Sequence, residues 1–233
     1  MGEFGEAGRV IDSGVPLLAK LAKSEPKGSV TLAIVDGMAK SAVATVAYMR
    51  DDYSTAQRIS TDVASTLEAN KPADDAQQSQ TAIARYIATN LAGQSTYELH
   101  DYAAAEKAML AALAARKYFG GHTVGDRRDQ AELSCWLAMA QARQGKLNIA
   151  AQTIGPVVAF ERELAARNHG DVWVPVDLAR ALYVQALTDK TRSTALLHEA
   201  SGLLDGAVPT IRGLHQPQKW RAKILAEEAA AHS

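Results

Sequence analysis

The chain has 233 residues, 47% of them hydrophobic and 22% charged, which is the composition of a folded protein with a substantial core rather than of a disordered one. Its formal net charge of -1 supplies no basic field of the kind that attracts nucleic acid or an anionic membrane. The single cysteine, Cys135, excludes an internal disulfide and a cysteine-rich zinc site.

Residues 1–28 form a leading segment, for which we predict one short helix. The first four, Met-Gly-Glu-Phe, resemble a cloning remnant, so we expect the chain to be a fragment of a longer protein. No basic region followed by an apolar core marks a signal peptide. No run approaches the roughly 20 apolar residues that a membrane helix needs. We therefore expect a cytoplasmic chain without a membrane segment.

Residues 29–50 are predicted to be helical, although the run Thr-Leu-Ala-Ile-Val within them could form a strand by itself. No partner strand is evident elsewhere in the sequence. The apolar residues recur at intervals of three and four, which is the helical period: Leu32, Val35, Ala39, Ala42, Val43, Val46 and Ala47. Ser29 is the expected N-cap, since it follows the break at Pro-Lys-Gly.

Turn and capping residues divide the rest of the chain into helical stretches of about 16 to 26 residues. We predict ten helices in an all-α fold. One lies in the leading segment, eight form four hairpins over residues 29–213, and a capping helix lies in residues 214–233.

A shared register of the hairpins is the strongest internal signal. Each of four turns is followed by a short motif that ends in alanine, and these alanines are separated by 49, 45 and 45 residues: Ala56, Ala105, Ala150 and Ala195. Twelve residues before them lie three small residues and one large one: Ala44, Gly93, Ala138 and Tyr183. We predict that the two helices of a hairpin approach closely at these positions, above all at Gly93 and Ala105.

This register resembles the tetratricopeptide repeat, whose first helix carries a small residue and whose second helix carries one near its start. The resemblance is good over residues 83–168 and weaker over 29–70 and 172–213. The period exceeds the standard 34 residues and is similar to the long repeats of kinesin light chains and many bacterial scaffold proteins. The resemblance implies a right-handed superhelical array of hairpins, in which the first helices line a concave face that receives a peptide or another protein.

Positions one turn either side of the small first-helix residue are expected to line that concave face. They supply the predicted partner-binding residues: Tyr48, Asn90, Gln94, Tyr97, Arg143 and Arg180. Further positions of the same face are Ser41, Glu132, Cys135, Met139, Asp177 and Val184. The carboxylate clamp that some repeats of this family use to hold a peptide C-terminus is not reproduced. We therefore predict a mixed polar and aromatic trough that holds a protein or peptide segment.

No catalytic motif is complete, so we expect neither enzyme activity nor a cofactor. Gly145-Lys146 lacks the preceding glycine of a phosphate-binding loop. Glu161, Glu163, His169 and Asp171 are the nearest approach to a metal-ligand set, but we favour a solvated helix end with Asp171 as N-cap and expect no metal. Cys135 lies in an apolar helical stretch and is expected to be buried and inert. Trp136, Trp173 and Trp220 are expected to pack in the core.

Two functions remain open on this reading. The first is a non-catalytic scaffold that binds a protein or peptide, as the interaction or sensory part of a larger bacterial signalling or regulatory protein. The alternative is a sensor domain that holds a small molecule or peptide signal inside the superhelix. An open trough would favour the first function and a closed pocket the second.

Overall fold

The computed structural model describes residue 20 and residues 29–119, 123–168, 170–207 and 214–231. The predicted leading helix lies almost wholly outside this part. No strand occurs among the described residues, which confirms the predicted all-α class. The chain divides into two compact units, Met1–Arg127 and Arg128–Ser233.

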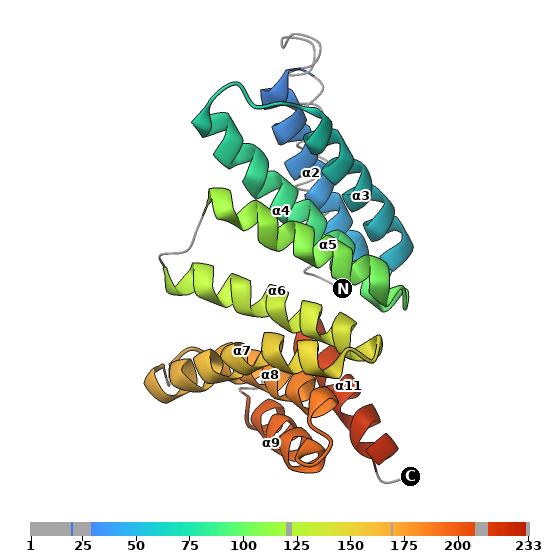
Figure 1. Ribbon diagram of the computed structural model, residues 1–233, viewed down its shortest axis with the longest axis vertical. Helices are drawn as coiled ribbons and strands as arrows, with labels where there is room; N and C mark the ends of the chain where they lie inside the picture. The colour runs from blue at the N-terminus through green and yellow to red at the C-terminus, as the bar shows by residue number, and fades with distance from the viewer. Residues whose placement is uncertain (1–19, 21–28, 120–122, 169, 208–213, 232–233) are drawn as a thin grey trace. The chain divides into compact units, whose positions relative to one another are not determined.

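Unit 1 contains four α-helices and a short 3-10 helix in its described part: α2 (Val30–Met49), α3 (Tyr53–Ala69), α4 (Asp75–Glu98), α5 (Tyr102–Ala115) and η1 (Arg116–Tyr118). Each α-helix packs against the next, and α4 also packs against α2 (Figure 1). The core between α2, α3 and α4 is built from small and branched side chains: Ile34, Val63, Leu67, Ala84 and Ala88. Ser29 caps α2 as predicted, because its hydroxyl accepts the amide of Leu32 at 3.3 Å.

Unit 2 contains nearly all of α6 (Val124–Arg143), followed by α7 (Leu147–Arg167), α8 (Val174–Thr188), α9 (Ser193–Gly206) and α11 (His215–Ala231). In this unit α7 packs on α8, α8 on α9, and α11 on both α9 and α8 (Figure 1). The eight hairpin helices and the terminal helix of the prediction are therefore present. The superhelical form of the array stays a prediction.

Three hairpin turns have the same backbone, which is the physical basis of the repeat. One residue of each turn has a left-handed φ: Asp51 (60°), His100 (66°) and Gly145 (77°). The next amide donates to a carbonyl oxygen five residues earlier, which closes a Schellman motif: Asp52 to Ala47, Asp101 to Thr96, and Lys146 to Gln141. The left-handed residues precede the repeat alanines by five positions each, so the spacing of those alanines is the spacing of identical turns.

Gly93 and Ala105 meet where α4 crosses α5, as predicted. A Cβ atom added to Gly93 would lie 2.9 Å from Cγ of Met109 and 3.4 Å from the carbonyl oxygen of Ala105. Ala105 is fully buried. Only glycine allows this approach without displacing a side chain, because Met109 already occupies the space beside it.

The fourth hairpin departs from the predicted register by one residue. Ala195 is exposed, whereas Leu196 is buried and is the fourth residue of α9, the place that Ala150 has in α7. The linkers before α3, α5 and α7 have three residues each, and the linker before α9 has four, residues 189–192. The extra residue starts α9 one position later, so the predicted role of Ala195 is wrong and Leu196 takes that position.

Replacing Gly93 by leucine is expected to lower the free energy of unfolding of unit 1 by about 1–3 kcal/mol, because the new side chain must displace Met109. Gly202 in α9 is the matched control, since a Cβ there meets nothing within 4 Å. Gly202→Leu should leave stability unchanged or raise it, because leucine has the higher helix propensity. Thermal unfolding followed by circular dichroism measures both variants. Equal melting temperatures for the two would show that α4 and α5 do not meet at Gly93.

Among the described helices, α2 alone is long and apolar enough, by length and composition, to cross a membrane. Only 22% of that stretch is buried, and Met38 and Val43 are among its exposed side chains. A core helix of a soluble protein and a signal sequence near an N-terminus have the same length and composition, so this is weak evidence for a span. The statement that no run approaches the length of an apolar membrane helix does not hold for α2, and the expectation of no membrane segment stays a prediction.

Candidate functional site

Five charged side chains of unit 2 form one network around α6 and α8, which we call the α6–α8 charge cluster. Arg180 of α8 donates to Oε1 of Glu132 in α6 at 3.0 Å and to Oδ1 of Asp177 at 3.1 Å. Arg128 of α6 donates to Oδ2 of Asp177 at 2.6 Å. A second nitrogen of Arg128 donates to Oδ2 of Asp171 at 2.7 Å. Asp177 therefore joins both guanidinium groups, and the five side chains fix one another in position.

The cluster follows from helical spacing. Arg128 and Glu132 are four residues apart on α6, and Asp177 and Arg180 are three residues apart on α8, so each pair lies on one face of its helix. The arginine comes first on α6 and the carboxylate comes first on α8. Each arginine therefore faces a carboxylate of the other helix. Exposure differs strongly across the cluster: the side chain of Arg180 is 8% exposed and that of Glu132 is 39% exposed. Arg180 therefore belongs to the packed interior of unit 2, whereas Glu132 is open to solvent.

Glu161 of α7 lies beneath the cluster, with its side chain buried. Its Oε2 atom has no hydrogen-bond partner. Burial, reinforced by the negative charge of Asp177, raises the pKa of Glu161 to about 7, although Arg180 and Arg128 act against the shift. The expectation that Glu161 belongs to a solvated helix end is therefore wrong, because α7 turns this residue toward α8.

Cys135 of α6 is buried beside Arg180. Burial raises the pKa of the Cys135 thiol to about 12, with Arg180 opposing the shift. The thiol therefore stays protonated and unreactive at neutral pH, as predicted. Arg180 also lies against an aromatic pair: the ring centroids of Trp136 and Trp220 are 5.3 Å apart, and the guanidinium carbon of Arg180 lies 5.8 Å from the ring centroid of Trp220.

Arg143, another predicted partner-binding residue, lies at the C-terminal end of α6. It donates to the hydroxyl of Tyr183 at 3.1 Å and to Oε2 of Glu227 in α11 at 2.8 Å. Arg143 therefore ties α6 to α8 and α11, and its side chain keeps 36% of its surface exposed.

Two of the predicted residues of unit 1, Tyr48 and Tyr97, pack within their hairpins, and the other two, Asn90 and Gln94, bond to each other along α4. Gln94 donates to Oδ1 of Asn90 at 3.1 Å. Gln94 is buried, and Asn90 is half-buried. Tyr97 is buried, with its ring centroid 5.2 Å from that of Tyr102 across the turn. Tyr48 is also buried, and its ring centroid lies 5.5 Å from that of Tyr53, the first residue of α3. Each of these two tyrosines packs the first helix of its own hairpin against the second, and their role in binding a partner stays a prediction.

Asp171 and Trp173 differ from what their sequence positions suggest. Asp171 accepts the amide of Trp173 at 2.9 Å, but Trp173 itself is the N-cap residue of α8, so the predicted N-cap is wrong. Trp173 is 37% exposed, unlike the buried Trp136 and Trp220.

Within the described residues, no group of three or more histidine, cysteine, aspartate or glutamate side chains could hold a metal ion, and His169 lies outside them.

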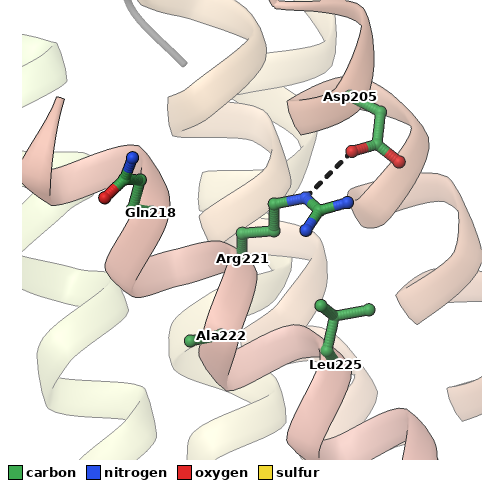
Figure 2. Close-up of a pocket in the computed structure, with 5 residues that line it drawn as sticks. All are labelled: Asp205, Gln218, Arg221, Ala222 and Leu225. Atoms are coloured by element: carbon green, nitrogen blue, oxygen red, sulfur yellow. Dashed lines mark hydrogen bonds and ion pairs between the residues drawn. The ribbon is translucent and has the colours of Figure 1, made fainter. Parts of the chain in front are cut away.

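One pocket of about 400 Å³ lies between α9 and α11 of unit 2 (Figure 2). Figure 2 shows the Arg221 side chain of α11 directed at Asp205 of α9, with its Nε atom 2.9 Å from Oδ1. The two charges neutralise each other, and both side chains are exposed. This pocket therefore has no uncompensated charge from Arg221 or Asp205 with which to bind a ligand.

The chain matches no family model, no curated protein and no solved structure. The resemblance to the tetratricopeptide repeat therefore stays a prediction, for which Gly93, Ala105, Ala138 and Ala150 are the clearest residues. The function of the charge cluster is inferred from its geometry and charge.

Four residues of this region were not predicted as part of a binding site: Arg128, Glu161, Asp171 and Trp173. The signal for Arg128 was its spacing of four from Glu132, which places opposite charges on one helix face. Glu161 is followed directly by Arg162 and Glu163, so no signal in the sequence distinguishes it from the exposed Glu163. No signal in the sequence distinguishes the exposed Trp173 from the two buried tryptophans.

Proposed function

We propose that the chain is a non-catalytic module that binds a protein or peptide segment, as the interaction or sensory part of a larger regulatory protein. The observation that carries this proposal is the α6–α8 charge cluster. Its side chains hold one another in position, while Glu132 and Asp171 keep 39% and 30% of their surface exposed. Charged groups that are ordered before binding lose little conformational entropy when a partner arrives.

The charge of the cluster indicates the kind of partner. Glu132, Asp171 and Asp177 supply three carboxylates against two guanidinium groups, and Glu161 adds a further negative charge when it ionises. Trp173, next to Asp171, adds an exposed aromatic side chain. Aromatic residues beside fixed charges are typical of the residues that dominate protein interfaces. The partner segment is therefore expected to carry lysine or arginine next to an apolar residue.

The alternative, a small ligand held by the first helices, has less support. The pocket of about 400 Å³ between α9 and α11 is lined by none of the six predicted partner-binding residues. A second pocket, of about 460 Å³ in unit 1, is lined by none of them either. The one cysteine, the strongest nucleophile available, is buried and protonated. A protein segment that lies along the helices needs no enclosed pocket.

Selection of a random peptide library against the immobilised chain tests this function. The selected peptides are expected to be enriched in lysine and arginine. Their affinity, measured by fluorescence anisotropy, should fall about tenfold or more for Glu132→Gln and for Trp173→Ala. Both substitutions affect exposed side chains, so circular dichroism should show an unchanged fold.

Glu163→Gln is the matched control, because Glu163 is a half-exposed glutamate of α7 whose ion pair is with Arg167 on the same helix. This variant removes the same charge outside the cluster and should bind the selected peptides normally. Peptides that bind all three variants equally would place the interaction surface elsewhere. A library that yields no binder at all would contradict the proposed function.

A further inference from the structure

Unit 1 contains a groove of about 460 Å³ where the C-terminal ends of α3 and α5 meet the start of α4. We call it the α3–α5 groove. Part of its lining is apolar, from Leu67, Ala82, Ala111, Ala114 and Ala115. Its volume is in the range of pockets that hold small organic ligands. None of these residues belongs to the α6–α8 charge cluster.

The charged residues of the groove are mostly cationic. Lys71, Arg85 and Lys117 line it, against the single carboxylate of Glu68. Arg85 lies 3.4 Å from Glu68, so these two charges compensate each other. Among the described residues, neither Lys71 nor Lys117 has an ion-pair partner. Two positive charges without an ion-pair partner therefore line one groove, although the net charge of the whole chain is -1.

Thr81 of α4 supplies a buried donor to the same groove. It is 5% exposed, and its hydroxyl has no hydrogen-bond partner. The hydroxyls of Thr45 and Thr89 lie in the same kind of helix and donate to the carbonyl oxygen four residues earlier. An unpaired buried hydroxyl is costly. A ligand oxygen that accepts from Thr81 would remove this cost.

We propose that the α3–α5 groove binds a small organic anion, whose carboxylate or phosphate group is held by Lys71, Lys117 and the hydroxyl of Thr81. The apolar part of the ligand lies on the alanines of α5 and on the ring of Tyr118, which is 56% exposed. A bare inorganic anion would leave this apolar lining uncovered, so the ligand has an apolar body as well as an acidic group. The site is independent of the function proposed for unit 2.

Titration of the ¹⁵N-labelled chain with phenyl phosphate, benzoate and neutral benzyl alcohol tests the proposal. At least one of the two anions should shift the amide signals of residues 67–85 and 111–118, and benzyl alcohol should shift them far less. The stronger anion identifies the acidic group as phosphate or carboxylate. Lys117→Gln should weaken binding about tenfold, because a hydrogen bond to a charged group is lost. Lys107→Gln removes an exposed charge of α5, outside the groove, and should bind normally.

Thr81→Val provides a second test that does not depend on charge. The change removes an unpaired hydroxyl, so the melting temperature of the ligand-free chain should rise, while the affinity for the anion should fall. A lower melting temperature would show that the hydroxyl already has a partner and would overturn the proposal. Equal binding by Lys117→Gln and Lys107→Gln, shifts spread over the whole chain, or no binding of either anion at about 10 mM would also overturn it.

Discussion

Arg180→Ala is expected to lower the free energy of unfolding of unit 2 by about 3–5 kcal/mol. The substitution leaves the carboxylates of Glu132 and Asp177 without the buried cation that both of them accept from. It also removes the guanidinium from the ring of Trp220. Urea unfolding followed by tryptophan fluorescence measures this loss selectively, since all three tryptophans of the chain lie in unit 2.

Arg192→Ala is the control for the loss of a positive charge. Arg192 pairs with Asp189 three residues away, and its side chain is exposed. Such surface pairs contribute at most about 1 kcal/mol. Equal destabilisation by the two variants would show that the α6–α8 charge cluster is not a structural network. The large expected effect also means that partner binding is better tested at Glu132 than at Arg180.

Unit 2 is expected to lose stability as the pH rises from about 4.5 to about 7, because of Glu161. Burial and Asp177 raise the pKa of this carboxyl from 4.5 to about 7 in the folded state, so folding favours the protonated form. The stabilisation is complete below pH 4.5, where the carboxyl is protonated in both states, and is lost as the pH passes through 7. The loss amounts to about 3 kcal/mol, since each pKa unit corresponds to about 1.4 kcal/mol.

Glu161→Gln isolates this contribution, because glutamine has nearly the same shape and does not ionise. At about pH 8 the variant should be more stable than the parent chain, and the difference should shrink as the pH falls toward 4.5. Glu163→Gln, on the exposed side of α7, should follow the parent chain at every pH. A stability difference between Glu161→Gln and the parent chain that is independent of pH would mean that Glu161 ionises normally.

Much of the fold is local and could be predicted. The helical period, the cap at Ser29 and the turns at Asp51, His100 and Gly145 depend on residues within about one turn of each other, so their signals lie together in the chain. The close approach of Gly93 to Ala105 could be predicted for the same reason, since both helices belong to one short hairpin. The register predicted for Ala195 is wrong, because one additional residue in the linker before α9 cannot be recognised from composition.

The site could be predicted only in part. Arg180, Glu132 and Asp177 were expected on one face of the first helices, and the structure brings them into one network. Burial was not predictable: Tyr48 and Tyr97 occupy positions that suit a trough, yet each packs against the aromatic residue across its own turn. A helical position specifies a direction around one helix, but not whether another helix covers it.

The sequence by itself determined the all-α class, the presence of the hairpin helices and the recurring turns, because each depends on interactions between near neighbours in the chain. Only the tertiary structure decided which charges meet and which side chains remain open to solvent. Arg128 and Asp177 are 49 residues apart, and the pKa of Glu161 is raised because α7 packs this carboxyl against α8, where it is buried. Contacts and burial of this kind depend on the packing of whole helices, which no short stretch of sequence encodes.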